Sequence, residues 1–337
     1  MILMDNNEMR HALEEELHRS FNHWVPEQDQ ELREILAYHM GWEGAGAGEK
    51  AQGKRIRPML VLLSAAAAGA DWRVALPAAA SVEYLHNFSL IHDDIEDQDE
   101  IRRGRPTVWV KWGIAKAINA GDLMCMLGLL SLFRLEKTVS LEVSARASQI
   151  LQETCAHLTR GQHLDLSYES EQILPLESYW PMVGGKTAAL LACCTEMGAI
   201  SAGVDEERRQ AFRDFGWHLG LAFQVVDDWL GIWGDAVITG KGVGSDLVAG
   251  KKSLPILYAL QKPGQFHDRW MAGPVKENDV ALLTEYLEKE GAKEYTRQKA
   301  DELTSQACAA LEKATEYQNE AFQGLSQLTD VLLKRRS

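Results

Sequence analysis

The hydrophobic positions of this chain fall mostly into long runs whose spacing matches an α-helix. Residues 59–70 are apolar on every side, which predicts a helix buried all round, and residues 76–97 form a longer apolar-periodic run. The same pattern predicts further helices at 114–136, 141–168, 176–200, 206–233, 253–262 and 278–331. Alternating strand patterns bounded by turn residues are weak.

Clusters of glycine, proline and charge interrupt this pattern and predict loops. They fall at residues 42–54, 102–107, 201–205, 234–252 and 263–275. No low-complexity linker separates the helical runs. We therefore expect one all-α helical bundle over residues 1–337, with its motifs between about 53 and 260.

Composition and charge narrow the classes of function. The 337 residues carry a formal net charge of −14, which repels phosphate backbones, so we expect no nucleic-acid partner. The five cysteines lack metal-ligand spacing, which favours reduced thiols in a cytoplasmic protein. The N-terminus shows no signal-peptide pattern, and no apolar stretch reaches roughly 18 residues, so we expect no stable membrane insertion.

Two acidic motifs follow apolar runs. Asp93 and Asp97 are four residues apart and would share one helix face, with Asp94 beside them. Asp227 and Asp228 end another apolar run, FQVVDD. Carboxylates without cysteine or histidine suit Mg²⁺, and two such helix ends facing one cavity would hold several ions against a diphosphate. Solvated acidic helix ends are the alternative for each motif.

Basic residues gather in separate clusters. In GKRIRP, Lys54 and Arg57 are three residues apart, on one helix face if the helix begins there. Arginine offers forked donors to phosphate oxygens and lysine offers a point charge. The remaining clusters are Arg102 with Arg103, Lys186 with Thr187, and the glycine-rich segment that carries Lys241, Lys251 and Lys252.

Taken together, these motifs resemble those of the trans-isoprenyl diphosphate synthases, the family of farnesyl and geranylgeranyl diphosphate synthases. The resemblance runs from about Gly53 to Leu260 and rests on five motifs in order: GKRIRP, HNFSLIHDDIEDQDEIRRGRPT, GGKTAAL, FQVVDD and GKGVGSDLVAGKKSLP. It implies an all-α bundle around a deep central cavity, a homodimer, and Mg²⁺ as cofactor, with three ions per active site. Its substrates would be isopentenyl diphosphate and an allylic diphosphate.

The resemblance also implies a role for each matching residue. The metal ligands would be Asp93, Asp94, Asp97, Asp227 and Asp228. The isopentenyl diphosphate pocket would comprise Lys54, Arg57, His86 and Arg103. The allylic diphosphate would be held by Arg102, Lys186, Lys241 and Lys251. Dipoles that stabilise the allylic cation would come from Thr187 and Gln224.

One departure concerns the second acidic motif. The family pattern there is commonly D-D-x-x-D, but position 231 of this chain is glycine. Asp235 is a candidate replacement for the missing acid, and a contribution through water is the alternative.

Product length is predicted from the residues just before Asp93. Phe88 lies five residues earlier, about 7 Å along a helix, and would form the floor of the cavity together with Ser89 and Tyr84. An aromatic residue there without an insertion in the motif resembles archaeal-type geranylgeranyl synthases, so we expect a C20 product. The alternatives are a C15 product, a class I terpene cyclase, and a non-catalytic subunit of a heteromeric synthase.

Overall fold

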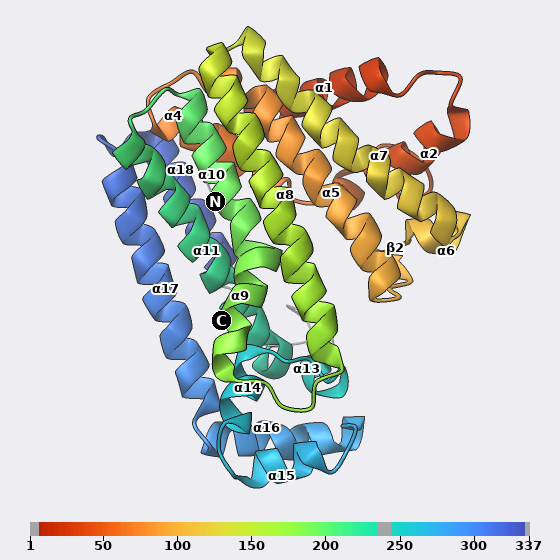
Figure 1. Ribbon diagram of the computed structural model, residues 1–337, viewed down its shortest axis with the longest axis vertical. Helices are drawn as coiled ribbons and strands as arrows, with labels where there is room; N and C mark the ends of the chain where they lie inside the picture. The colour runs from red at the N-terminus through yellow and green to blue at the C-terminus, as the bar shows by residue number, and fades with distance from the viewer. Residues whose placement is uncertain (1–6, 235–243, 334–337) are drawn as a thin grey trace. The chain divides into compact units, whose positions relative to one another are not determined.

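The computed structural model describes residues 7–234 and 244–333. The protein is 78% helical, and its strands are limited to one two-residue hairpin in the described part of the chain (Figure 1). The expectation of an all-α fold is therefore confirmed.

Backbone contacts group the described residues into two compact units. The first comprises residues up to Gln152 together with 194–209 and 317–322. The second comprises residues 153–193, 210–316 and those from Gln323 onward. The expectation of one domain remains a prediction, and each unit is described separately below.

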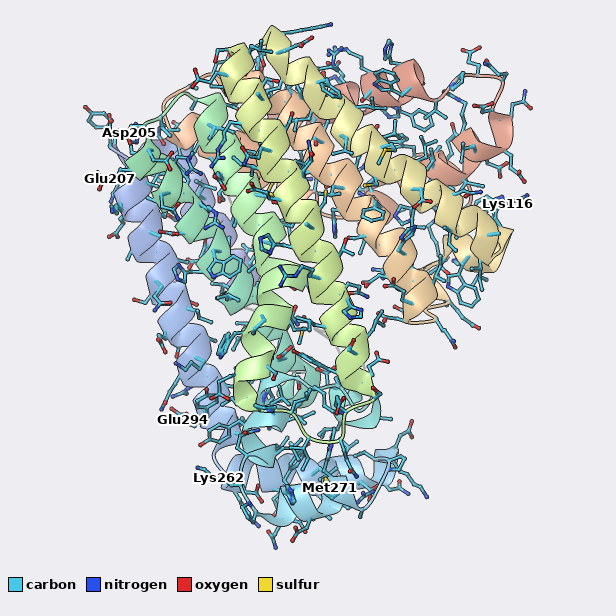
Figure 2. All side chains as sticks on the ribbon, in the orientation of Figure 1. Lys116, Asp205, Glu207, Lys262, Met271 and Glu294 are labelled. Carbon is cyan, nitrogen blue, oxygen red and sulfur yellow. The ribbon has the colours of Figure 1, made fainter. Side chains whose placement is uncertain are left out.

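The first unit contains the N-terminal helices and the hairpin. Its elements are α1 (Asn7–Trp24), α2 (Gln30–His39), α3 (Glu49–Gln52), α4 (Ile56–Ala67), the 3₁₀ turn η1 (Trp72–Ala75), α5 (Leu76–Glu96), β1 (Ile101–Arg102), β2 (Arg105–Pro106), α6 (Val108–Trp112), α7 (Ile114–Leu132) and the 3₁₀ turn η2 (Phe133–Lys137). Lys116 of α7 forms an ion pair of 2.5 Å with Glu31 of α2 on the surface of this unit (Figure 2).

Helix α5 is central to the first unit because it packs against α4, α1 and α7. Pro77 stands in its first turn, where a missing backbone N–H costs nothing. Gly128 of α7 lets the two helices approach closely, since a Cβ there would lie 3.1 Å from the Ser81 carbonyl oxygen. This packing buries most of α5 and leaves its last turn at the edge, where the acidic motif lies.

The second unit contains most of the C-terminal half. Its elements are the 3₁₀ turn η3 (Leu176–Ser178), α9 (Tyr179–Val183), the π-helical turn η4 (Gly184–Ala188), α13 (Ser245–Val248), α14 (Leu254–Leu260), α15 (Gln265–Met271), the 3₁₀ turn η5 (Glu277–Asp279), α16 (Val280–Lys289), α17 (Ala292–Ala314) and α18 (Glu320–Leu333), whose first residues belong to the first unit. Like α18, three further helices contribute residues to both units: α8 (Leu141–Glu169), α10 (Ala189–Ser201) and α11 (Glu206–Trp233).

A buried apolar cluster joins the end of α11 to the elements that follow it. Ile232 of α11, Leu247 of α13 and Ile256 of α14 have essentially no exposed surface, and they pack in one cluster with Phe266 and Leu283. Because these residues fix their chain neighbours, the cluster also sets where residues 231 and 246 lie.

Several element predictions were wrong in detail. The run at 278–331 divides into separate helices, with Gly291 at a φ of +85° between α16 and α17. Short helices α13 and α15 lie inside two predicted loops. Asp227 and Asp228 do not end their helix, because α11 continues to Trp233.

The segment Ile114–Lys137 corrects the expectation about apolar length. It is long and apolar enough to cross a membrane by length and composition alone, and 44% of its most apolar window is buried within the protein. A core helix of a folded domain meets the same criterion.

Candidate functional site

In the first unit, the last turn of α5 separates the three predicted aspartates into two environments. Asp94 is almost fully buried at 1% exposure, whereas Asp93 is half-buried and Asp97 is exposed. The Asp97 N–H donates to the Asp93 carbonyl oxygen at 2.8 Å, which keeps these two residues one helical turn apart. Their spacing on one helix face agrees with the sequence pattern, whereas the Asp94 side chain is turned into the protein.

Asp94 forms an ion pair with the hairpin that follows α5. Arg102 of β1 donates from Nε to the Asp94 Oδ1 oxygen at 2.5 Å, while the Oδ2 oxygen is buried with no hydrogen-bond partner among the described residues. Burial raises the pKa of Asp94 to about 6, although Arg102 opposes that rise. The Asp94 carboxylate therefore orients Arg102, and its role as a metal ligand stays a prediction.

Three of the predicted isopentenyl diphosphate residues come together in the first unit. Arg57 Nη1 lies 3.1 Å from His86 Nε2. Burial, followed by the charges of Arg57, Arg103 and Arg102, holds the pKa of His86 well below its usual value, so the ring is neutral. Arg103 donates to the carbonyl oxygens of Ala51 (2.9 Å) and Gln52 (3.1 Å).

Position 53 must be glycine for Arg103 to lie there. Gly53 has a φ of +77°, and a Cβ on it would lie 2.8 Å from the Arg103 guanidinium carbon. Lys54 is exposed and precedes α4, which begins at Ile56. The helix begins after Lys54, so the condition under which Lys54 and Arg57 would share a helix face is not met.

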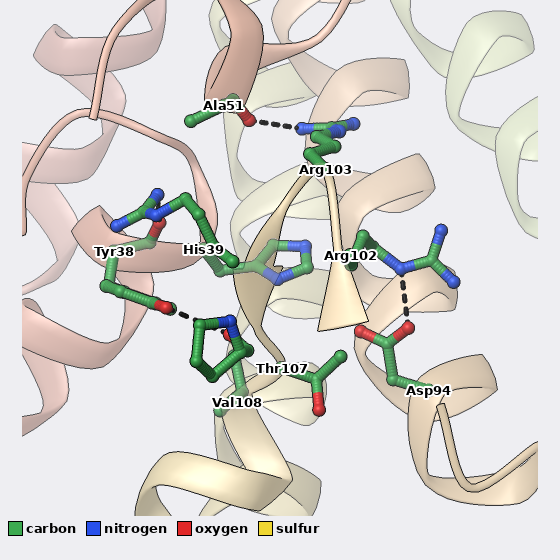
Figure 3. Close-up of a pocket in the computed structure, with 10 residues that line it drawn as sticks. Tyr38, His39, Ala51, Asp94, Arg102, Arg103, Thr107 and Val108 are labelled. Carbon is green, nitrogen blue, oxygen red and sulfur yellow. Dashed lines mark hydrogen bonds and ion pairs between the residues drawn. The ribbon is translucent and has the colours of Figure 1, made fainter. Parts of the chain in front are cut away.

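A pocket in the first unit lies between α2 and the hairpin (Figure 3). Arg102, Arg103 and Asp94 line it together with His39, a residue that the sequence did not single out. The Nε2 atom of His39 is buried and has no hydrogen-bond partner in the part of the chain that the structure describes. Burial and the surrounding arginines lower the pKa of His39 to about 3.

In the second unit, the two adjacent aspartates of α11 also differ. Asp227 is exposed and Asp228 is 5% exposed. The Asp228 Oδ2 oxygen accepts hydrogen bonds from the Tyr179 hydroxyl (2.7 Å) and the Leu254 N–H (2.9 Å), and its Oδ1 oxygen accepts from Gln224 Nε2 (3.0 Å). Burial raises the pKa of Asp228 to about 7, although these donors counteract the rise.

Gln224 links this aspartate to the predicted GGKTAAL motif. Its Oε1 oxygen accepts a hydrogen bond of 3.0 Å from the Thr187 hydroxyl, so both predicted dipoles belong to one network with Asp228. Thr187 lies in the π-helical turn η4, a rare geometry that often occurs at functional sites.

Lys186 lies in the same turn and points toward α8. Its Nζ atom is 2.5 Å from the Asp165 Oδ2 oxygen. Helix α8 approaches this closely because residue 161 is glycine: a Cβ there would lie 2.1 Å from the Lys186 backbone nitrogen. Lys186 is therefore paired with Asp165, an acid that lies outside the motifs of the sequence.

Lys251 lies at the end of α13. Gly250, at a φ of +67°, ends that helix, and the Lys251 N–H donates to the Asp246 carbonyl oxygen at 3.0 Å, as in a Schellman motif. Desolvation lowers the pKa of Lys251, but Asp246 and Asp228 raise it more, so the net shift is upward. The predicted Lys241 and the candidate Asp235 lie outside the described residues.

The predicted chain-length residues lie on α5. The Phe88 ring is half-buried and meets the His92 ring edge-on at 4.9 Å between centroids. The Ser89 hydroxyl donates to the His86 carbonyl oxygen at 2.8 Å. Tyr84 has no exposed surface, and its hydroxyl donates to the Leu17 carbonyl oxygen of α1 at 2.6 Å. Tyr84 is thus tied to the packing of α1 on α5.

The chemistry of the exposed acids fits a hard cation. Among the residues that the structure describes, no three histidine, cysteine or acidic side chains form a preassembled metal cage. Mg²⁺ is commonly bound through one or two carboxylates with phosphate oxygens completing its shell. Asp93 with Asp97, and Asp227, offer such carboxylates at accessible positions.

Comparison with known proteins identifies relatives that match most of the chain. The sequence model described as polyprenyl synthetase matches residues 47–288. The chain is 42% identical over 282 residues to a (2E,6E)-farnesyl diphosphate synthase of Mycobacterium tuberculosis, covering 81% of this chain and 77% of that protein. It is 38% identical over 305 residues to a geranylgeranyl diphosphate synthase of the same organism, covering 88% and 85%.

A solved structure agrees with the same assignment. The geranylgeranyl pyrophosphate synthase of Corynebacterium glutamicum, complexed with isoprenyl diphosphate and magnesium, superposes with a TM-score of 0.83. The two sequences are 28% identical, and the match covers 100% of each chain.

Proposed function

This chain belongs to the polyprenyl synthetase family as a short-chain trans-prenyltransferase, and from that premise we propose that it condenses isopentenyl diphosphate with an allylic diphosphate to give the C20 product, geranylgeranyl diphosphate. Mg²⁺ is its cofactor in this proposal, with three ions per active site. The magnesium and isoprenyl diphosphate bound by the Corynebacterium glutamicum relative support the choice of cofactor and substrate class.

One observation carries the proposal. Arg57 and Arg103, with the neutral His86 ring beside Arg57, form a basic group in the same unit as the acidic end of α5 and the Arg102–Asp94 pair. A second diphosphate needs such a group, whereas a terpene cyclase ionises one substrate and does not. The basic group therefore favours chain elongation over cyclisation.

The proposed reaction assigns a step to each group of charged residues. Arg102, Lys186 and Lys251 bind the allylic diphosphate, together with Lys241. The bound metal supplies electrostatic stabilisation of the diphosphate leaving group. The C–O bond then breaks, and the bonding electrons leave with pyrophosphate. The double bond of isopentenyl diphosphate attacks C1 of the allylic cation, and a proton passes to the released pyrophosphate as the new double bond forms.

The roles of the paired aspartates differ in this proposal. Asp93, Asp97 and Asp227 are accessible and serve as ligands toward the metal. Asp94 and Asp228 are buried and position their neighbours: Asp94 holds Arg102, and Asp228 holds the Gln224–Thr187 pair. Thr187 and Gln224 then turn their dipoles toward the allylic cation.

Product length depends on Phe88 in this proposal. The half-buried ring lies on the helix that carries Asp93, and its edge-on contact with His92 holds it in place. Replacing it with alanine removes the ring and should lengthen the products beyond C20. Tyr317→Ala is a matched control, because Tyr317 is 77% exposed. An unchanged product profile in Phe88→Ala would rule out Phe88 as the floor.

A homodimer in the cytoplasm completes the proposal. Apolar side chains remain exposed along α6 and α7, including Val110 at 44%, Ile114 at 53% and Ile118 at 42%. A second copy of the chain would bury these exposed apolar side chains. The five cysteines form no disulfide, which fits a reducing compartment.

Labelled isopentenyl diphosphate provides the test. The protein is incubated with Mg²⁺ and, separately, with C5, C10 or C15 allylic diphosphate, and the products are dephosphorylated and sized. A C20 alcohol ending all three series supports the proposal, and a C15 end point retains elongation but removes the length assignment. Loss of allylic substrate without isopentenyl incorporation would indicate a cyclase, and complete inertness a partner-dependent subunit.

A further inference from the structure

Position 231 is the place where the second acidic motif lacks its third acid. Residue 231 follows Asp227 by four, so the two share one face of α11. A Cβ at Gly231 would lie 2.3 Å from the Oδ2 oxygen of Asp246 and 2.5 Å from its carboxyl carbon. The Asp246 carboxylate therefore lies directly against the α-carbon of Gly231, on the face of α11 that carries Asp227.

Packing explains why Asp246 lies there. Ile232, the neighbour of Gly231, and Leu247, the neighbour of Asp246, are both fully buried in one apolar cluster. Helix α13 is thereby fixed against the end of α11, and Asp246 is 8% exposed. A side chain at position 231 would displace either the carboxylate or the short helix.

The surroundings of Asp246 carry the charges expected of a diphosphate site. The field of Asp246 acts on Asp228 and on Lys251, both of which already have roles in the proposed function. The Asp246 carbonyl oxygen also accepts the Lys251 N–H, so the acid and the lysine are positioned by one turn.

We propose that Asp246 replaces the third acid of the second aspartate motif and directs its carboxylate toward the same Mg²⁺–diphosphate group as Asp227. The inference rests on the proposed function and deepens it. Glycine at 231 is then the residue that makes room for an acid from α13. This assignment takes the place of Asp235, the candidate that the sequence offered.

A metal titration without turnover tests this assignment. The full chain is titrated with Mn²⁺ in the presence of inorganic pyrophosphate, and bound Mn²⁺ is followed by electron paramagnetic resonance alongside the unfolding temperature. The variants are Asp246→Asn, Asp227→Asn and the exchange Gly231→Asp with Asp246→Ala. Asp268→Asn is the matched control, because that side chain is 82% exposed in the same unit.

The expected result is a shift in metal affinity. Asp246→Asn should raise the Mn²⁺ concentration at half-saturation by roughly 10- to 100-fold, the range seen for residues that support a metal site. The exchange variant should recover most of that loss, because it returns an acid to position 231 and removes the clash. Asp268→Asn should titrate like the unsubstituted protein.

Three other results would distinguish failure of this inference from failure of the proposed function. Asp246→Asn with unchanged metal affinity, while Asp227→Asn is weakened, would overturn the inference and leave the proposed function standing. A lower unfolding temperature in Asp246→Asn without a shift in metal affinity would assign Asp246 a purely structural role and also overturn it. If the unsubstituted protein shows no pyrophosphate-dependent Mn²⁺ binding, the proposed function itself fails.

Discussion

The aspartate pair on α5 and the pair on α11 divide their residues in the same way but hold the buried member differently. Neighbouring residues on a helix point about 100° apart, so one acid of each pair faces outward and the other inward. Asp94 is held by one charged partner, Arg102, and keeps one oxygen without a hydrogen-bond partner among the described residues. Asp228 is held by three neutral donors.

This difference shows what the second aspartate of each pair contributes. A carboxylate paired with arginine fixes the direction of a cation that can bind phosphate. A carboxylate paired with a hydroxyl, an amide and a backbone N–H fixes uncharged groups and the start of α14. The same Asp-Asp sequence therefore orients an arginine guanidinium in one unit and a network of neutral hydrogen-bond donors in the other.

The largest expected effect comes from the outward-facing acids. Asp93→Ala and Asp227→Ala should each lower the turnover rate by roughly 10²–10⁴, equivalent to about 3–5 kcal/mol in the barrier, because each removes a proposed metal ligand. Steady-state kinetics at saturating Mg²⁺ would measure this effect. Near-normal turnover in either variant would contradict its assignment as a ligand, and Asp268→Asn serves as the control for charge loss alone.

A smaller kinetic effect is expected from the buried acid of α5. Asp94→Ala removes the closer ion-pair partner of Arg102 and leaves Asp99, at 3.8 Å. A hydrogen bond to a charged group is worth about 1.5–3 kcal/mol, so kcat/KM should fall roughly 10- to 100-fold. Asp94→Ala, Arg102→Ala and the double variant form a cycle that measures the coupling. Additive losses would contradict the pairing, because they would mean that Asp94 acts independently of Arg102.

The buried acid of α11 should instead affect stability. Tyr179→Phe removes one of the two donors to the Asp228 Oδ2 oxygen and leaves the Leu254 N–H in place. The free energy of unfolding should fall by about 1–3 kcal/mol, measured by urea denaturation, with a change in kcat/KM of only a few-fold. A large kinetic loss without destabilisation would show that Tyr179 acts on substrate and not through Asp228.

The sequence was sufficient to predict the long helices. The apolar period at 206–233 corresponds to α11, and the run at 76–97 corresponds to α5 within one residue. These helices have enough turns for the period to emerge. Helix α15 was missed because its seven residues stand in a segment rich in glycine and proline, where local composition predicts a loop.

The sequence was insufficient to separate the acids of the two pairs. Spacing places Asp93 with Asp97, but burial of Asp94 depends on Arg102, which returns to α5 only after the hairpin forms. Asp246 was passed over although it lies inside a quoted motif, because its contact with Gly231 joins residues 15 positions apart through the core of the second unit. Such tertiary contacts leave no period in the sequence.

The smallest expected effect concerns pH and depends on the arginines that surround His39 in the first unit. The pKa of His39 falls to about 3 in the folded protein because of burial and the charges of Arg103 and Arg102. The unfolded chain binds this proton near pH 6.5, whereas the folded protein does not. The contribution of His39 to stability is therefore complete above pH 6.5 and is lost as the pH falls toward 3.

His39→Gln should reduce the slope of unfolding free energy against pH between 7.5 and 5.5, by at most about 1.4 kcal/mol per pH unit. Urea denaturation at several pH values in that range would measure the slope. His86 should preserve part of the dependence, because its pKa is lowered by the same environment. His11→Gln is the control, since that side chain is 80% exposed on α1 of the same unit. Equal slopes in His39→Gln and the control would mean that the arginines around the pocket do not keep His39 neutral.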